Sequence, residues 1–159
     1  INDGRSYRPN ASPLAANDNG VFAVLKPSQV SGAFSGNVVR VYNFPNPFNL
    51  QTKTVPLNTG AGNNCQLGAT TSITTNGTVI KYEIPAQVGG PGVIRIYTLS
   101  GRLVTELDLG IVSPGSCVYF QWDGRNRQGA PVANGVYYGI LTVNGAKTQS
   151  GTFKLAVIR

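Results

Sequence analysis

Alternation of apolar and polar residues with a period of two constrains the fold of this chain more than any other feature. In TVIKYEIP (78–85), Ile80, Tyr82 and Ile84 fall on one side, and Lys81 and Glu83 fall on the other. Successive side chains of a strand point to opposite faces, so this pattern predicts a strand with one face in a core. The same alternation recurs in residues 92–99, 117–124, 135–144 and 151–159.

Turn-forming residues separate these segments, and helical spacing does not persist anywhere between them. The turns are rich in Gly, Pro, Asn and Asp, and they fall at residues 85–92, 98–102, 112–116, 122–135 and 144–147. Several short alternating strands at this spacing predict an all-β sandwich or barrel.

The first part of the chain has a different composition. Residues 1–19 are polar and interrupted by proline, which is typical of an extended N-terminal arm. Residues 20–39 hold the short apolar run GVFAVLKP (20–27), a candidate additional strand, and then a linker. The chain opens with Ile1 rather than Met, so we expect that a leader or a longer upstream region has been removed.

Charge and hydropathy argue against two classes of partner. Thirteen Lys and Arg against six Asp and Glu leave a net charge of +7, but the basic residues are scattered and form no stripe with interleaved aromatics. We therefore expect no nucleic-acid binding, and a surface suited to solubility or to acidic cell envelopes. No apolar run approaches the roughly 20 residues that span a bilayer, so we expect no membrane-embedded segment.

The two cysteines point to an oxidising compartment. Cys65 and Cys117 are not part of a CxxC pair, which argues against zinc. In a chain rich in Gly, Asn, Thr and Ser, two lone cysteines favour one disulfide and a secreted or cell-surface location. Two buried free thiols are the alternative.

Residues for catalysis are scarce, so we expect no enzyme activity and no cofactor. The chain has no histidine, which excludes Ser-His-Asp and Cys-His arrangements. Glu106 and Asp108 would share a strand face, which indicates a solvated surface rather than a glycosidase pair. Asp123 and Asn126 resemble part of a calcium loop, but Arg125 and Arg127 bring positive charge there, so a tight turn capped by Asp123 is favoured.

Three segments carry a family resemblance. They are YNFPNPFN (42–49), the strand pair IKYEIP and VIRIYTLSGRLVTEL (80–85 and 93–107), and WDGRNRQGAPVANGVYYGIL (122–141), followed by the basic strand FKLAVIR (153–159). Together they resemble the immunoglobulin-like domain shared by flagellar hook-capping proteins and the C-terminal sorting domains of type IX secretion substrates. The resemblance covers residues 40–159. Its motif residues are Pro45, Asn46, Pro47, Phe48, Gly101, Arg102, Trp122, Asp123, Gly124, Gly135 and Tyr137.

The resemblance implies an immunoglobulin-like antiparallel β-sandwich, here with an N-terminal extended arm. Residues 42–49 would form the entry to the sandwich, with prolines that end pairing at an exposed edge. Phe44 or Phe48 would close the open end of the core. Residues 54–77 are longer than the usual link, which suggests an inserted hairpin or loop tied to the core by Cys65 and Cys117.

Three functions are compatible with these features. The first is a secreted structural subunit that assembles with copies of itself into a filament or surface layer, because a polar arm needs a partner to order it and can add as a strand to a neighbour. The arm residues expected to take part are Tyr7, Leu14, Val21, Phe22 and Val24.

The second function, implied by the family, is a sorting or scaffold domain that addresses a larger exported protein to outer-membrane secretion machinery. The third is a carbohydrate-binding or adhesive module. It would use a row of outward-facing rings drawn from Tyr7, Tyr42, Tyr97, Tyr119 and Tyr138.

Overall fold

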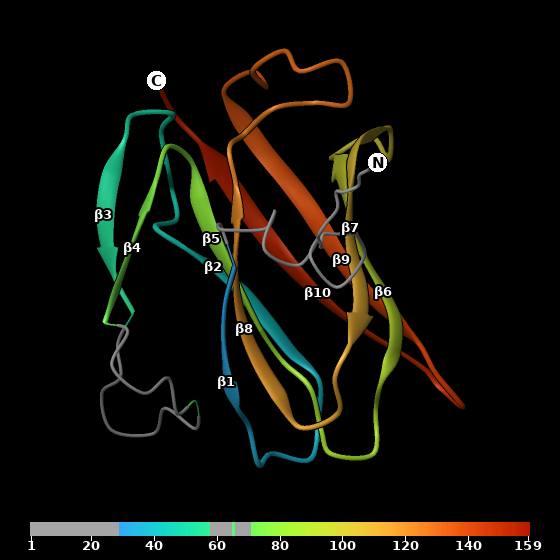
Figure 1. Ribbon diagram of the computed structural model, residues 1–159. Coiled ribbons are helices and arrows are strands. Elements are labelled where there is room, and N and C mark those ends of the chain that lie inside the picture. Colours follow the sequence, from blue (N-terminus) through green and yellow to red (C-terminus); the bar gives the residue numbers. More distant parts are fainter. Residues whose placement is uncertain (1–28, 58–64, 66–70) are drawn as a thin grey trace, which may run out of the picture.

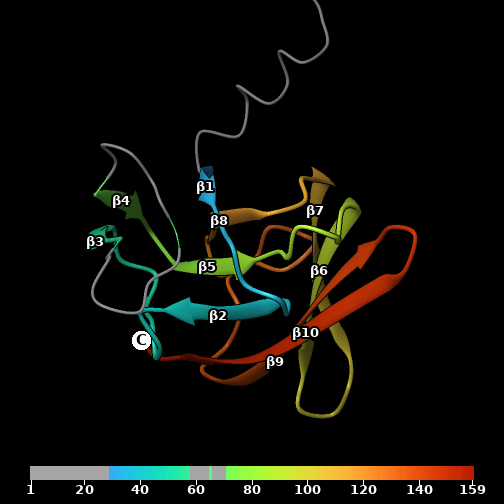
Figure 2. The ribbon, with the colours of Figure 1, turned by 90° about the horizontal axis from the view of Figure 1, so that it is seen from below.

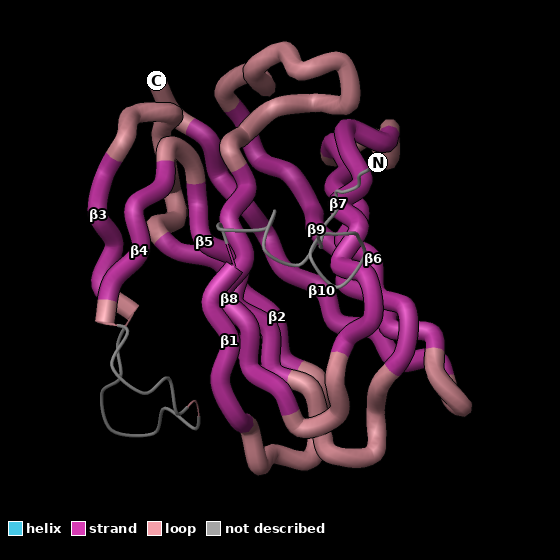
Figure 3. The backbone as a smooth tube through the Cα atoms, viewed as in Figure 1, coloured by secondary structure: helices cyan, strands magenta, loops and turns pink. Residues whose placement is uncertain are grey.

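The computed structural model of the protein describes residues 29–57, 65 and 71–159. The described residues form strands, turns and loops and no helix (Figure 3). The strands are β1 (Gln29–Ala33), β2 (Arg40–Phe44), β3 (Lys53–Pro56), β4 (Ser72–Thr75), β5 (Thr78–Glu83), β6 (Gly90–Thr98), β7 (Leu103–Val112), β8 (Ser116–Trp122), β9 (Gly135–Asn144) and β10 (Thr148–Val157).

Two four-stranded sheets make up the body of the molecule. The first has the order β1-β8-β5-β2 and the second the order β10-β9-β6-β7, and every pairing of neighbouring strands is antiparallel. Figures 1 and 2 show the two sheets facing each other. This confirms the predicted all-β antiparallel sandwich.

The core between the sheets follows the period-two pattern. The strands that supply it contribute alternate side chains, because residues on the other face cannot reach the facing sheet. The buried set includes Ile80, Tyr82, Ile84, Ile94, Ile96, Val118, Trp122, Tyr137, Leu141, Val143, Phe153, Leu155 and Val157.

The first sheet begins earlier in the chain than expected. β1 pairs with β8 from Gln29 opposite Phe120 to Ala33 opposite Ser116. A linker was expected between residue 27 and residue 40, but part of it forms β1, so the sheet includes residues that precede position 40. The arm and the apolar run at 20–27 lie outside the described residues.

The segment at 54–77 contributes a third layer. β3 and β4 pair with each other, from Lys53 opposite Thr75 to Pro56 opposite Ser72, and form a separate two-stranded sheet. Figures 1 and 2 place this hairpin beside the first sheet, on the side away from the second sheet. Its apolar side chains pack on the outer face of β5 and β8 in a second cluster made of Phe34, Val55, Leu57, Cys65, Ile73, Val79, Cys117 and Tyr119. All six residues of β5 are therefore buried.

Candidate functional site

The proline-rich segment at 44–49 closes one side of the sandwich. The Asn46 side chain forms hydrogen bonds with the backbone at the edge of β10, as a neighbouring strand would. Its Nδ2 donates to the Lys154 carbonyl (3.0 Å), and its Oδ1 accepts from the Ala156 N–H (2.8 Å). Phe48 continues this pairing, because its N–H donates to the Ala156 carbonyl and its carbonyl accepts from the Ile158 N–H (both 2.9 Å). The segment thus joins β2 of the first sheet to β10 of the second.

Phe48 is the ring that enters the core. It is 1% exposed and meets Trp122 edge-to-face, with ring centroids 5.7 Å apart. Phe44, the other candidate, packs instead against Tyr119 in the second cluster, on the far face of the first sheet. Phe44 and Phe48 are separated by Pro45 and Pro47, both preceded by cis peptide bonds.

The loop after Trp122 is held by its own side chains and by the tryptophan. The Trp122 Nε1–H donates to the Arg125 carbonyl (3.1 Å). Asp123 Oδ1 accepts from the Arg125 N–H, and Asn126 Oδ1 accepts from the N–H groups of Gln128 and Ala130. The side-chain oxygens that calcium would need therefore accept hydrogen bonds within the turn. The Arg125 guanidinium lies 3.6 Å from the Asp123 carboxylate. This geometry supports the capped-turn interpretation.

Gly124 couples this loop to the proline-rich segment. Its φ is +73°, and a Cβ at this position would meet Leu50 Cδ2 and, at 3.3 Å, Phe48 Cε2. Its carbonyl accepts from the Val132 N–H (2.9 Å).

We expect Gly124→Ala to lower the free energy of unfolding by at least about 2 kcal/mol, because it combines a left-handed backbone with crowding of a packed ring. Gly129→Ala is the matched control. Gly129 has a φ of +82° in the same loop but open space around it, so this change should cost about 1 kcal/mol. Urea denaturation of both variants measures the difference, and equal losses would contradict the coupling.

The remaining motif residues also shape turns. Gly101 adopts a φ of +84° in the β6–β7 turn, where the Thr98 carbonyl accepts its N–H and Thr98 Oγ1 accepts the Arg102 N–H. Gly135 has a φ of +149° at the start of β9. The buried Tyr137 donates its hydroxyl to the Ala133 carbonyl (2.8 Å), a bond like that of the tyrosine corner of Ig-like sandwiches.

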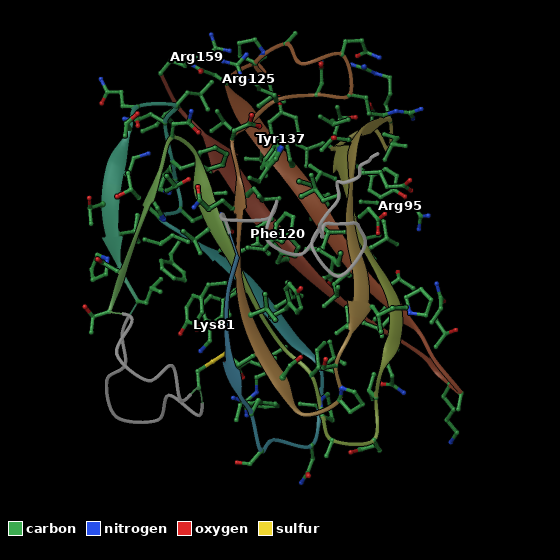
Figure 4. The ribbon with its side chains drawn as sticks, viewed as in Figure 1. Lys81, Arg95, Phe120, Arg125, Tyr137 and Arg159 are labelled. Atoms are coloured by element: carbon green, nitrogen blue, oxygen red, sulfur yellow. A yellow bond between two sulfur atoms is a disulfide. The ribbon has the colours of Figure 1, made fainter. Side chains whose placement is uncertain are left out.

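Arg159 reaches the same loop through its Nη2, which donates to the Val132 carbonyl. Figure 4 shows Arg125, Tyr137 and Arg159 together at one end of the molecule. The motif residues that carry the family resemblance therefore build loops and edges, and most of them meet at this end.

Beneath the third layer lies a buried cluster of charges. The Lys81 Nζ is 2.6 Å from Glu83 Oε2, and both side chains are 4% exposed. Arg40 Nη1 lies 3.4 Å from the other Glu83 oxygen. Burial disfavours the charged ammonium of Lys81, but hydrogen bonds to Glu83 and Tyr42 outweigh this and raise its pKa above the ordinary value. The Lys81 ammonium also lies 5.5 Å from the ring centroids of both Tyr42 and Tyr119.

The predicted disulfide lies next to these charges. Cys65 and Cys117 are bonded, with their Cα atoms 5.7 Å apart, and they attach the inserted segment to β8. In the described part of the chain, Cys65, Cys117 and Glu83 form a cluster whose possible metal-ligand atoms lie within 4.8 Å of one another. The two sulfur atoms are bonded to each other and Glu83 contacts Lys81, so the arrangement serves as a cross-link and an ion pair.

The tyrosine rings do not form one exposed row. Tyr119 is buried under the third layer, which makes the expectation for this ring wrong. Tyr97 and Tyr138 are register partners on the outer face of the second sheet, while Tyr42 lies on the outer face of the first. Tyr7 is outside the described residues. On the same outer face of the second sheet, Glu106 forms an ion pair with Arg95, and Asp108 accepts from the Gly110 N–H.

A groove that the sequence analysis did not anticipate lies on the side opposite the proline-rich segment. It runs between β1 and β7, has a volume of about 440 Å³, and is lined by Gly32, Ala33, Tyr82, Leu109, Ile111, Val112, Val118 and the turn 113–116. Leu109, Val112, Val118 and Tyr82 lie at its base, nearly buried in the core, and polar and apolar groups line the groove in similar proportion. Burial raises the pKa of the Tyr82 hydroxyl, which stays neutral there.

No sequence pattern marked this groove, because it depends on which two edges the topology sets opposite each other. Ile111 was the available signal: it is an apolar residue at an outward position near the end of a strand, and it is 76% exposed. The arm residues predicted to take part in assembly, Tyr7, Leu14, Val21, Phe22 and Val24, all lie outside the described residues.

These features define a class of protein. The described chain is an immunoglobulin-like β-sandwich in which the recurrent motif residues serve architecture. The family described as the FlgD Ig-like domain matches residues 68–147, and the chain belongs to this family.

Comparison with known proteins adds two observations. The crystal structure of FlgD from P. aeruginosa is 19% identical to this chain, with a TM-score of 0.42, and the match covers 76% of this chain and 77% of that one. No curated protein matches the chain. Among the described residues, no helix is long and apolar enough to cross a membrane.

Proposed function

We propose that this chain is a secreted, non-catalytic structural subunit that associates with copies of itself in an extracellular filament or surface layer. The observation that carries the proposal is the asymmetry of the sandwich. Asn46 and Phe48 complete the β10 edge on one side, whereas β1 and β7 leave a groove between them on the other. Among the described residues β1 and β7 each pair with one strand, and strand edges of this kind favour strand addition from another molecule.

The disulfide supports the extracellular location. Bonds of this kind persist in oxidising compartments and are rare in the cytosol. The third layer that the disulfide attaches also covers the outer face of the first sheet. This additional packing favours a stable structural domain.

Sedimentation velocity of the full chain and of a chain lacking residues 1–28 tests the proposal. This deletion ends before β1, so the described sandwich stays complete. We expect the full chain to associate as its concentration rises and the shortened chain to remain a monomer. A full chain that stays monomeric at every concentration would contradict self-association.

A sorting role for a larger exported protein is the second candidate, and it rests on the resemblance of the motif residues to sorting domains. In that case outer-membrane secretion machinery is the partner. Fusion of the full chain to a reporter in a type IX-competent host tests this role. Export of the fusion, together with retention of a fusion whose Trp122→Ala change disrupts the sandwich, would support it.

A further inference from the structure

The groove between β1 and β7 is bordered by two strand edges with capacity for a further strand. In the described part of the chain, β1 pairs with β8 alone and β7 with β6 alone. The loop 123–134 reaches only the start of the β7 edge, where the Arg127 N–H donates to the Val104 carbonyl (3.2 Å). The groove lies at the other end of this edge, at Leu109–Val112.

The two ends of β7 differ in how they are protected. Proteins commonly place charges on edge strands to prevent unwanted pairing. Glu106 and Asp108 supply exposed charges within the first six residues, but the last four, Leu109–Val112, carry none. Ile111 stands at the groove with 76% of its surface exposed, so this end of the edge has no charge that would oppose an incoming strand.

We propose that this groove receives the apolar segment 21–25 of a second copy of the chain, added as a strand. This inference rests on the proposed function and names its acceptor site. Backbone groups of the incoming strand would pair with a free edge, and alternate side chains of Val-Phe-Ala-Val-Leu would contact Leu109, Val112 and Val118 at the base of the groove. Residues 1–28 of the sequence lie before β1, which is one wall of the groove, and the donor segment is among them.

Chain connectivity favours a neighbouring copy over the same molecule as donor. Three residues, 26–28, separate Leu25 from Gln29, where β1 begins. If the segment folded back antiparallel on its own β1, Leu25 would lie beside Gln29, and only Phe22 and Val21 would reach Gly32 and Ala33. The groove is bounded by Gly32 and Ala33, at the far end of β1, so most of the apolar run would miss it. A segment from another copy has no such tether.

The geometry has a consequence for assembly. The donor segment and the acceptor groove are different surfaces of one chain, so the contact is heterologous. Repeated from copy to copy, a heterologous contact that does not close into a ring builds an open filament.

A charge placed at the groove tests the acceptor site. In the full chain, we expect Ile111→Lys to weaken association measured by sedimentation velocity by at least about tenfold, because the ammonium would have to be desolvated against the incoming strand. Leu99→Lys is the matched control: Leu99 is 63% exposed but lies in the β6–β7 turn, away from the groove. Circular dichroism melting of both variants verifies that each still folds.

The outcomes separate this inference from the proposed function. Association of the wild type and of Leu99→Lys, with loss in Ile111→Lys, supports the groove. If wild type and Ile111→Lys associate equally, the groove assignment is overturned and self-association stands. If the wild type does not associate at all, the proposed function fails as well.

Cross-linking identifies the donor. Phe22→Cys in one chain and Ser113→Cys in a second, mass-tagged chain should give a mixed two-chain disulfide when the chains are combined, since Ser113 lines the groove. Phe22→Cys combined with Ser100→Cys, in the β6–β7 turn, is the control and should give far less. A mixed product no greater than the control would overturn the assignment. So would a cross-link within one chain carrying both Phe22→Cys and Ser113→Cys at high dilution.

Discussion

Replacing Trp122 with alanine is expected to lower the free energy of unfolding by about 3–5 kcal/mol, as for other large aromatic residues removed from cores. The indole is 3% exposed and packs edge-to-face on Phe48, so its removal leaves a cavity where the proline-rich segment meets the core. It also removes the Nε1–H donor to the Arg125 carbonyl, which holds the following loop. Urea denaturation followed by circular dichroism is the appropriate measurement, because Trp122 is the single tryptophan of the chain.

Trp122→Phe separates the two contributions. It keeps a ring against Phe48 and loses the N–H donor, so it should cost clearly less than Trp122→Ala. A loss below about 1 kcal/mol in Trp122→Ala would mean that the residue is not central to the core.

Breaking the Cys65–Cys117 bond should lower the free energy of unfolding by about 4 kcal/mol in the chain-entropy account, given a sequence separation of 52 residues. The physical reason is that the bond restricts the unfolded chain between residues 65 and 117, a stretch that includes β4 to β7. It also attaches the inserted segment to β8, over the buried Lys81–Glu83 pair. Thermal melting with and without reducing agent measures the effect.

The double variant Cys65→Ala/Cys117→Ala provides the control. It should melt at a lower temperature than the oxidised wild type and should not respond to reducing agent. An unchanged melting temperature in wild type, with both thiols shown to be free after reduction, would contradict a stabilising role for the bond.

Several elements could be predicted from local pattern. β5, β6, β8, β9 and β10 all carry clear period-two alternation, because each places alternate residues in one core. The positions of the turns could also be predicted, since Gly101 and Gly124 occupy backbone conformations with positive φ that glycine adopts without strain. The disulfide followed from having two cysteines and a composition suited to secretion.

Other elements could not be predicted because their reasons lie far away in the sequence. β1 has the sequence QVSGA, which shows no alternation, and it is a strand because β8 offers it a partner edge. Lys81 and Glu83 occupy polar positions of an alternating strand, which normally indicates a solvated face. They are buried because the Tyr42 and Tyr119 rings lie beside Lys81 and the Cys65–Cys117 pair lies beside Glu83, and the close ion pair offsets the cost of removing the charges from water.

Sequence pattern was sufficient for the kind of fold and for the residues at its turns, since hydrophobic periodicity and backbone conformation are properties of neighbouring residues. The order of the strands, the third layer and the groove between β1 and β7 were decided by tertiary packing. Whether a strand edge or the outer face of a sheet is covered depends on which distant segments pack against it. Local sequence patterns do not contain this information.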